Sequence, residues 1–101
     1  EGLEQVHRSS SVNSALSLRR SFLRMVKTEG ESAISWIGRV RSRALELSHT
    51  PCPATVVDTI LVITEGLPLQ YAPVLTQLES LPFDSLTIKD VTTRITGFEA
   101  Q

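Results

Sequence analysis

Residues 17–47 read SLRRSFLRMVKTEGESAISWIGRVRSRALEL, and this stretch decides the fold. Its apolar residues recur at steps of three and four on both sides of a short break at residues 28–31. Such spacing aligns apolar side chains along one face of an α-helix. The stretch therefore predicts two amphipathic helices joined by a turn, and an all-α fold for the chain.

The first of these two helices is predicted to begin at Val12 and to extend to about Lys27, because Gly30 interrupts the pattern. Residues 1–10 are predicted to form a separate helical turn, followed by a break at the serines 9–11. The apolar stripe of this helix comprises Ala15, Leu18, Phe22, Met25 and Val26.

The second helix has two candidate N-terminal caps. Thr28 and Glu31 have the spacing of a capping box, while Ser32 is an alternative cap, and the sequence does not choose between them. The helix is predicted to end before Ser48, because Pro51 and Pro53 cannot continue it. Its apolar stripe comprises Ile34, Ile37, Val40, Ala44 and Leu47.

A third helix is predicted from Pro53 to Gly66. Proline is favoured in a first helical turn, and a glycine followed by an apolar residue is a common helix end. The many β-branched residues between 56 and 63 also suit a strand. We favour the helix, since proline and glycine bracket the run and no partner strand is evident elsewhere.

Two shorter helices complete the predicted bundle of about five. One contains Tyr71 to Leu78, with Pro73 in its first turn, and a loop at residues 81–85 follows it. The last helix is capped by Thr87 and continues to Phe98, with Asp90 in the position of the acidic capping partner.

Composition narrows the possible functions of this 101-residue chain. Ten Lys and Arg residues balance eleven Asp and Glu residues, which argues against nucleic-acid binding by this segment. Eight of the ten cations nevertheless precede residue 44. A single cysteine, Cys52, excludes an internal disulfide and suits a reducing compartment. No signal peptide or membrane span is evident, so we expect a cytoplasmic protein without membrane contact.

The sequence offers little for catalysis. His7, His49 and Cys52 are too few and too scattered for a closed zinc site, and a Cys–His pair in the loop lacks an orienting group. Glu29 and Glu31 are better explained as acidic residues at a helix start. We therefore expect no enzyme activity, no metal, no cofactor and no small-molecule substrate.

Two separated stretches resemble the Gag polypeptide of copia-type LTR retrotransposons. The first is residues 17–47, with its leucine–arginine helix and its Met-x-x-x-Glu-Gly-Glu-Ser turn. The second is residues 59–95, TILVITEGLPLQYAPVLTQLESLPFDSLTIKDVTTRI, with its Gly-Leu-Pro segment and its Leu-Thr-Ile before the last helix. The two stretches occur in the family's order, and the resemblance extends over nearly the whole chain.

Within the first stretch, Glu31 and Arg39 around Trp36 resemble the major homology region of retroviral-type capsid proteins. The resemblance implies that Glu31 and Arg39 form a buried polar pair and that Trp36 is an aromatic core residue. It also implies one domain over residues 1–101, with leading helices in about 1–27 and a part like the capsid C-terminal domain in about 28–101.

The function implied is structural: self-association, as a homodimer or higher oligomer, into a virus-like shell that packages the element's RNA. The resemblance implies that RNA is bound only by segments outside this chain. A domesticated, monomeric adaptor that binds a peptide of another protein is the alternative. Our candidate interface residues are Trp36, Val57, Leu61, Tyr71 and Leu75.

Overall fold

The computed structural model describes residues 14–100, apart from the side chain of Phe83. Over this range the chain is all-α and contains no strand, which confirms the predicted fold class and rejects the strand alternative for residues 56–63. The helical turn predicted within residues 1–10, and His7 with it, lies outside the described residues.

Five α-helices and two short 3-10 helices make up the described chain. Residues 14–23 are helical, and we call them the leading helix. The others are α2 (Ala33–Leu47), α3 (Val56–Glu65), η1 (Leu69–Tyr71), α4 (Ala72–Glu79), η2 (Phe83–Ser85) and α5 (Ile88–Glu99).

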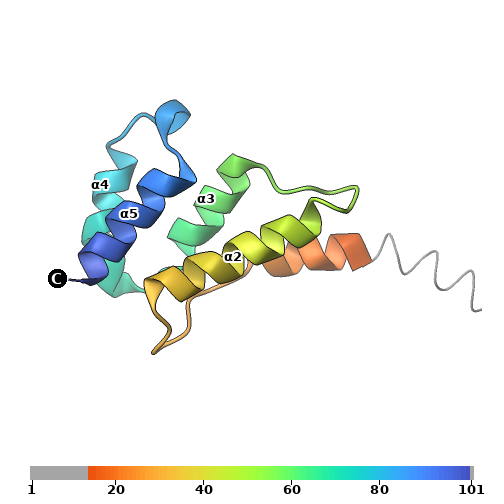
Figure 1. The fold of residues 1–101 in the computed structure, drawn as a ribbon, viewed down its shortest axis with the longest axis horizontal. Coiled ribbons are helices and arrows are strands. Elements are labelled where there is room, and N and C mark those ends of the chain that lie inside the picture. The colour runs from red at the N-terminus through yellow and green to blue at the C-terminus, as the bar shows by residue number, and fades with distance from the viewer. Residues whose placement is uncertain (1–13, 101) are drawn as a thin grey trace, which may run out of the picture.

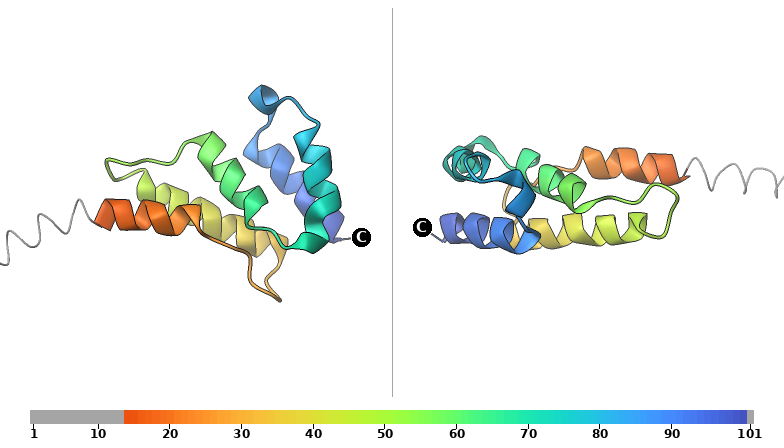
Figure 2. Two further views of the ribbon diagram at one scale, coloured as in Figure 1. Left: turned by 180° about the vertical axis from the view of Figure 1, so that it is seen from behind. Right: turned by 90° about the horizontal axis from the view of Figure 1, so that it is seen from above.

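The helices lie in two layers, which the views in Figure 1 and Figure 2 show together. Helices α2 and α5 form one layer, and the leading helix, α3 and α4 form the other. The leading helix runs antiparallel to α2, and Arg43 Nη1 donates a hydrogen bond of 2.9 Å to Ser21 Oγ between them. An ion pair of 3.3 Å between Arg19 and Asp58 joins the leading helix to α3.

The leading helix ends at Leu23, earlier than the predicted end near Lys27. The physical reason is a tertiary contact. The backbone N–H of Lys27 donates a 2.9 Å hydrogen bond to the carbonyl of Gly66 at the end of α3. Residues 25–28 therefore leave helical geometry to reach α3.

Short-range capping sets the helix starts. Ser32 caps α2 by accepting a hydrogen bond from the N–H of Ser35, which resolves the choice left open between Ser32 and Thr28. Helix α3 begins at Val56 and not at Pro53, because Thr55 forms a capping box with Asp58. The predicted capping box of Thr87 and Asp90 at the start of α5 is confirmed.

The core is organised around Trp36, which is fully buried and donates a 3.1 Å hydrogen bond from Nε1 to the carbonyl of Ile63. Gly66 packs directly against this ring. A Cβ at Gly66 would lie 2.5 Å from Trp36 Cζ2 and 2.7 Å from the carbonyl oxygen of Met25. Gly66 has φ −83°, a conformation open to any residue, so the glycine is required by space and not by a left-handed helix end.

Candidate functional site

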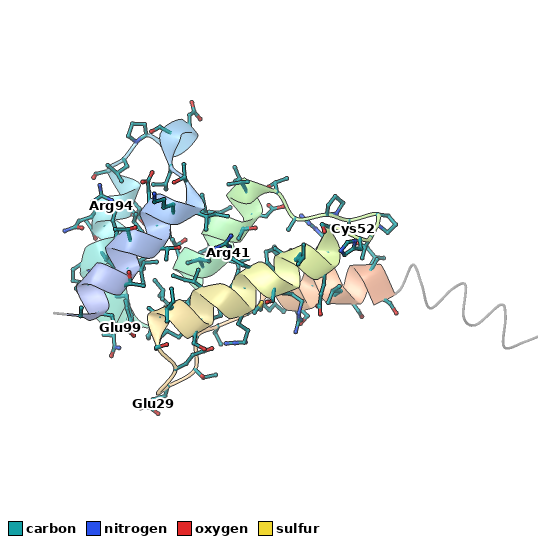
Figure 3. The ribbon with its side chains drawn as sticks, viewed as in Figure 1. Glu29, Arg41, Cys52, Arg94 and Glu99 are labelled. Atoms are coloured by element: carbon teal, nitrogen blue, oxygen red, sulfur yellow. The ribbon has the colours of Figure 1, made fainter. Side chains whose placement is uncertain are left out.

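The chemically reactive side chains are dispersed. Figure 3 shows Cys52 in the loop after α2, Glu29 in the turn before it, and Glu99 at the end of α5. Within residues 14–100, no group of three or more His, Cys, Asp or Glu side chains is placed to hold a metal ion. Cys52 is half-buried, and its N–H donates to Thr50 Oγ1 at 3.1 Å in a local turn.

The predicted Glu31–Arg39 pair is present. Arg39 Nε lies 3.0 Å from Glu31 Oε2, and Arg39 Nη2 lies 3.0 Å from Glu31 Oε1, so the two side chains form a bidentate pair. Glu31 Oε1 also accepts hydrogen bonds from the backbone N–H and the hydroxyl of Thr28, at 3.1 and 3.2 Å. The pair therefore closes the turn that precedes α2.

The pair is only partly buried, which corrects the expectation of a buried pair drawn from the capsid resemblance. The Arg39 side chain is 42% exposed and that of Glu31 is 11% exposed. Hydrogen bonding from Arg39 is the main reason that the pKa of Glu31 falls from 4.5 to about 2, with Thr28 contributing and partial burial opposing. An ion pair in such contact with water contributes little to stability, because solvent screens it.

Arg39 also contacts two groups besides Glu31. Its Nη2 donates a 2.8 Å hydrogen bond to the carbonyl of Val26, and its guanidinium lies 5.1 Å from the centre of the Trp36 ring. Arg39 thus connects the segment after the leading helix with the turn before α2 and covers the outer side of the core tryptophan.

A second polar contact, absent from our predictions, joins the ends of α2 and α5. Glu99 Oε2 accepts hydrogen bonds from the backbone N–H of Ala33 at 2.8 Å and from the hydroxyl of Tyr71 at 3.1 Å. The carboxylate therefore satisfies a free N–H at the start of α2, where the helix dipole favours negative charge. Burial first, and then Glu99, raises the pKa of Tyr71.

The structure separates the five candidate interface residues into two groups. Trp36 and Tyr71 are core residues, fully buried and 2% exposed. The core role implied for Trp36 by the capsid resemblance therefore holds, and neither residue is available for an interface. Val57 and Leu61 are 44% and 41% exposed on one face of α3, and Leu75 is half-buried on α4. These three remain accessible for contact with another molecule.

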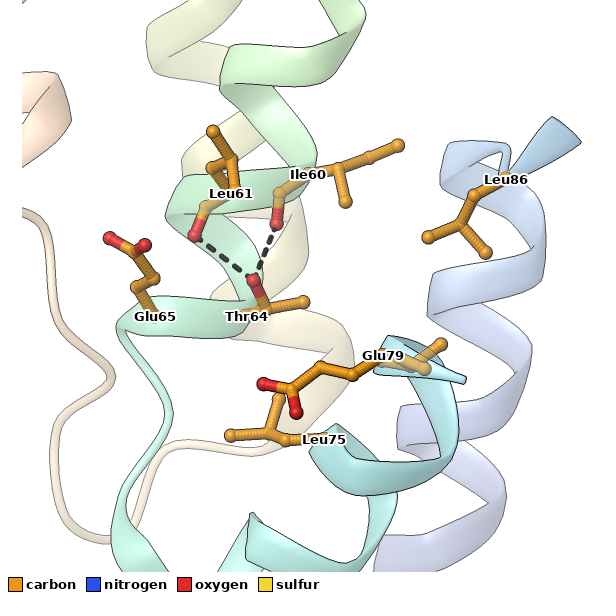
Figure 4. A pocket seen from close by; sticks show the side chains of 8 residues that line it. Ile60, Leu61, Thr64, Glu65, Leu75, Glu79 and Leu86 are labelled. Carbon is orange, nitrogen blue, oxygen red and sulfur yellow. Dashed lines mark hydrogen bonds between the residues drawn. The ribbon is translucent and has the colours of Figure 1, made fainter. Parts of the chain in front are cut away.

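Leu61 and Leu75 line a groove between α3 and α4, which Figure 4 shows from close by. Its volume is about 190 Å³. Its lining is mainly apolar and comprises Ile60, Leu61, Leu75, Leu78 and Leu86, together with Thr64. The Thr64 hydroxyl donates back to the carbonyl of Ile60 at 3.0 Å, so it presents its methyl group and little unsatisfied polarity to the groove.

Two exposed carboxylates, Glu65 and Glu79, complete the lining of the groove. Sequence reasoning missed both, because their position beside the groove depends on how α3 and α4 diverge. The combination of an apolar lining with acidic side chains suits a ligand that carries both apolar groups and cations.

Comparison of the chain with models of known protein families, with curated proteins and with solved structures gives no match. Within the described residues, no helix is both long enough and apolar enough to cross a membrane.

Proposed function

We propose that this chain is a self-associating structural domain of the capsid type, derived from the Gag protein of a copia-like retrotransposon. The resemblance of residues 17–47 and 59–95 to that family supports the proposal. The observation that carries it is the exposed apolar face of α3, where Val57 and Leu61 lie one turn apart beside the groove.

Burial of that face against a second copy is favourable in water. Apolar surface contributes roughly 25 cal/mol for each Å² removed from solvent. A contact made by so few apolar side chains is weak alone. A shell repeats it by symmetry, so that many weak contacts add up. In this proposal the domain supplies the protein–protein contacts of the shell, and RNA is held by segments outside this chain.

The test is the apparent mass of the chain over a concentration series, measured by analytical ultracentrifugation or light scattering. We expect dimers or larger species to increase with concentration, and we expect Val57→Ser/Leu61→Ser to shift the series toward monomer. Ile34→Ser/Leu45→Ser is the matched control, because Ile34 and Leu45 are equally apolar and at least as exposed on α2. A wild-type chain that stays monomeric up to about 1 mM would reject self-association.

The groove favours one alternative, a domesticated adaptor that binds a peptide of another protein as a monomer. Apolar grooves between helices commonly accept an amphipathic helix through residues at helical spacing. The same concentration series separates the two functions. A capsid-type domain forms dimers or larger species as its concentration rises, whereas an adaptor of this kind stays monomeric.

A further inference from the structure

The exposed side of the leading helix carries apolar and basic residues together. Leu16 and Leu23 are 45% and 50% exposed and lie seven residues apart, so they share one side of the helix. Arg20 lies between them in sequence, and Arg24 follows one turn later; both are exposed. We call this surface of apolar residues edged by cations, formed by Leu16, Arg20, Leu23 and Arg24, the basic stripe.

The α3–α4 groove has the complementary composition. It has an apolar lining to receive leucine side chains, and it has Glu65 and Glu79 to receive cations. The three ion pairs formed within residues 14–100 involve neither the two arginines of the basic stripe nor these two glutamates. Both the basic stripe and the acidic groove are therefore free to pair with a surface of opposite charge.

The leading helix cannot occupy the groove of its own copy. The hydrogen bond from Arg43 to Ser21 and the ion pair of Arg19 with Asp58 hold it on α2 and on the start of α3. Figure 2 shows α3 between the leading helix and α4, all within one layer. The basic stripe and the groove thus belong to the same layer but lie on opposite sides of α3.

We infer that the α3–α4 groove of one copy binds the leading helix of a second copy, with Arg20 and Arg24 against Glu65 and Glu79. This inference rests on the proposed self-association and names its interface. Because both surfaces are present on every copy, two copies related by a two-fold axis form the contact twice. Leu61 lines the groove and is covered by this contact, and Val57 lies one turn before it on α3.

A charge exchange tests the pairing directly. Arg20→Glu/Arg24→Glu makes the stripe acidic, and Glu65→Lys/Glu79→Lys makes the groove basic. We expect each double variant alone to self-associate about tenfold or more weakly than the wild type in ultracentrifugation, because like charges then face each other. An equimolar mixture of the two variants is expected to associate again, since each helix then meets a groove of opposite charge.

Control variants make the same change of net charge elsewhere. Arg41→Glu/Lys89→Glu and Glu29→Lys/Asp84→Lys alter exposed residues of α2, α5, η2 and the turn before α2 that take part in none of the three ion pairs within residues 14–100. We expect them to associate as the wild type does, and circular dichroism verifies that every variant is folded. Wild-type association that also falls with added salt supports the ionic component.

Each result decides between the interface and the function. If the wild type associates and the reversals weaken it no more than the controls do, the inferred interface is wrong while self-association stands. If the reversals weaken it but the mixture does not restore it, the pairing of helix with groove is wrong. A strictly monomeric wild type rejects both and leaves the groove to a foreign peptide.

Discussion

The two regions on either side of Trp36 differ in what holds them together. On the core side, the carbonyl of Met25 and the Trp36 ring pack against Gly66 with no space for a Cβ. On the solvent side, Arg39 donates a hydrogen bond to the carbonyl of Val26 and pairs with Glu31 in contact with water. Trp36 and Arg39 are one helical turn apart on α2, yet only the first is buried.

The difference separates recognisable residues from stabilising ones. The charged pair could be named from the sequence, because Glu31 and Arg39 match the capsid resemblance by position. The glycine and the tryptophan instead form a close contact between segments far apart in the chain, and interiors at native packing density tolerate little change of volume. We therefore expect the largest losses of stability at Trp36 and Gly66, and the smallest at Glu31.

Trp36→Ala should have the largest effect. It removes a fully buried indole and leaves the carbonyl of Ile63 without its donor, so we expect a loss of about 4 kcal/mol in the free energy of unfolding. Urea unfolding followed by circular dichroism measures the loss. A loss below about 1 kcal/mol would show that the core collapses around the cavity more readily than its packing indicates.

Gly66→Ala should lower the free energy of unfolding by about 3 kcal/mol, nearly as much as Trp36→Ala. The added methyl group meets a backbone carbonyl as well as the Trp36 ring. Gly38→Ala is the matched control. A Cβ at Gly38 meets nothing within 4 Å, and the residue lies within α2, so this change should stabilise the domain by about 0.5 to 1 kcal/mol. Equal effects at the two glycines would contradict the close contact at Gly66.

Glu99→Gln and Tyr71→Phe test the connection between the ends of α2 and α5. Each weakens or removes hydrogen bonds to one carboxylate oxygen, and we expect each to cost about 1 kcal/mol in urea unfolding. The double variant should cost less than the sum of the two single variants, because they share a contact. Strict additivity would show that the Tyr71 hydroxyl and Glu99 act independently.

Glu31→Gln should have the smallest effect, below about 1 kcal/mol at pH 7, because solvent screens the pair. The folded-state pKa of Glu31, about 2, lies below the ordinary value of 4.5. The ionised pair therefore stabilises the fold above pH 4.5, and this contribution is lost as the pH falls from about 4.5 to about 2.

The measurement for Glu31 is the difference in unfolding free energy between wild type and Glu31→Gln across that pH range. The difference between the two free energies of unfolding should become smaller as the pH falls from about 4.5 to about 2. A loss of 2 kcal/mol or more in the free energy of unfolding at pH 7 would show that the pair is shielded from solvent, as the capsid resemblance implies.

Much of the fold could be predicted from spacing within a few residues. The capping box of Thr87 with Asp90 depends on neighbours three positions apart, and it was found in the sequence. The stripe of α2 was found only in part: Ile37, Val40 and Leu47 are buried. Ile34 is instead 60% exposed, and Trp36 lies in the core. The Glu31–Arg39 pair, which is present, was implied by the capsid resemblance and not by spacing. Its exposure was not, because burial depends on which segments pass over the pair.

Long-range contacts account for what the sequence did not show. Leu61 and Trp36 are both large apolar residues on predicted helices, yet one faces solvent and the other is enclosed by α3 and the segment before α2. The same holds for Glu99, which caps a helix 66 residues earlier in the chain. No local pattern marks such partners.

Residue spacing thus determined an all-α chain and the capped start of α5, because helical hydrogen bonds and caps join residues only three or four positions apart. The tertiary structure alone decided where Gly66 meets Trp36, where Glu99 meets Ala33, and that α3 and α4 diverge to leave a groove between them. The first two contacts join residues 30 and 66 positions apart, and all three features follow from the packing of whole helices against one another.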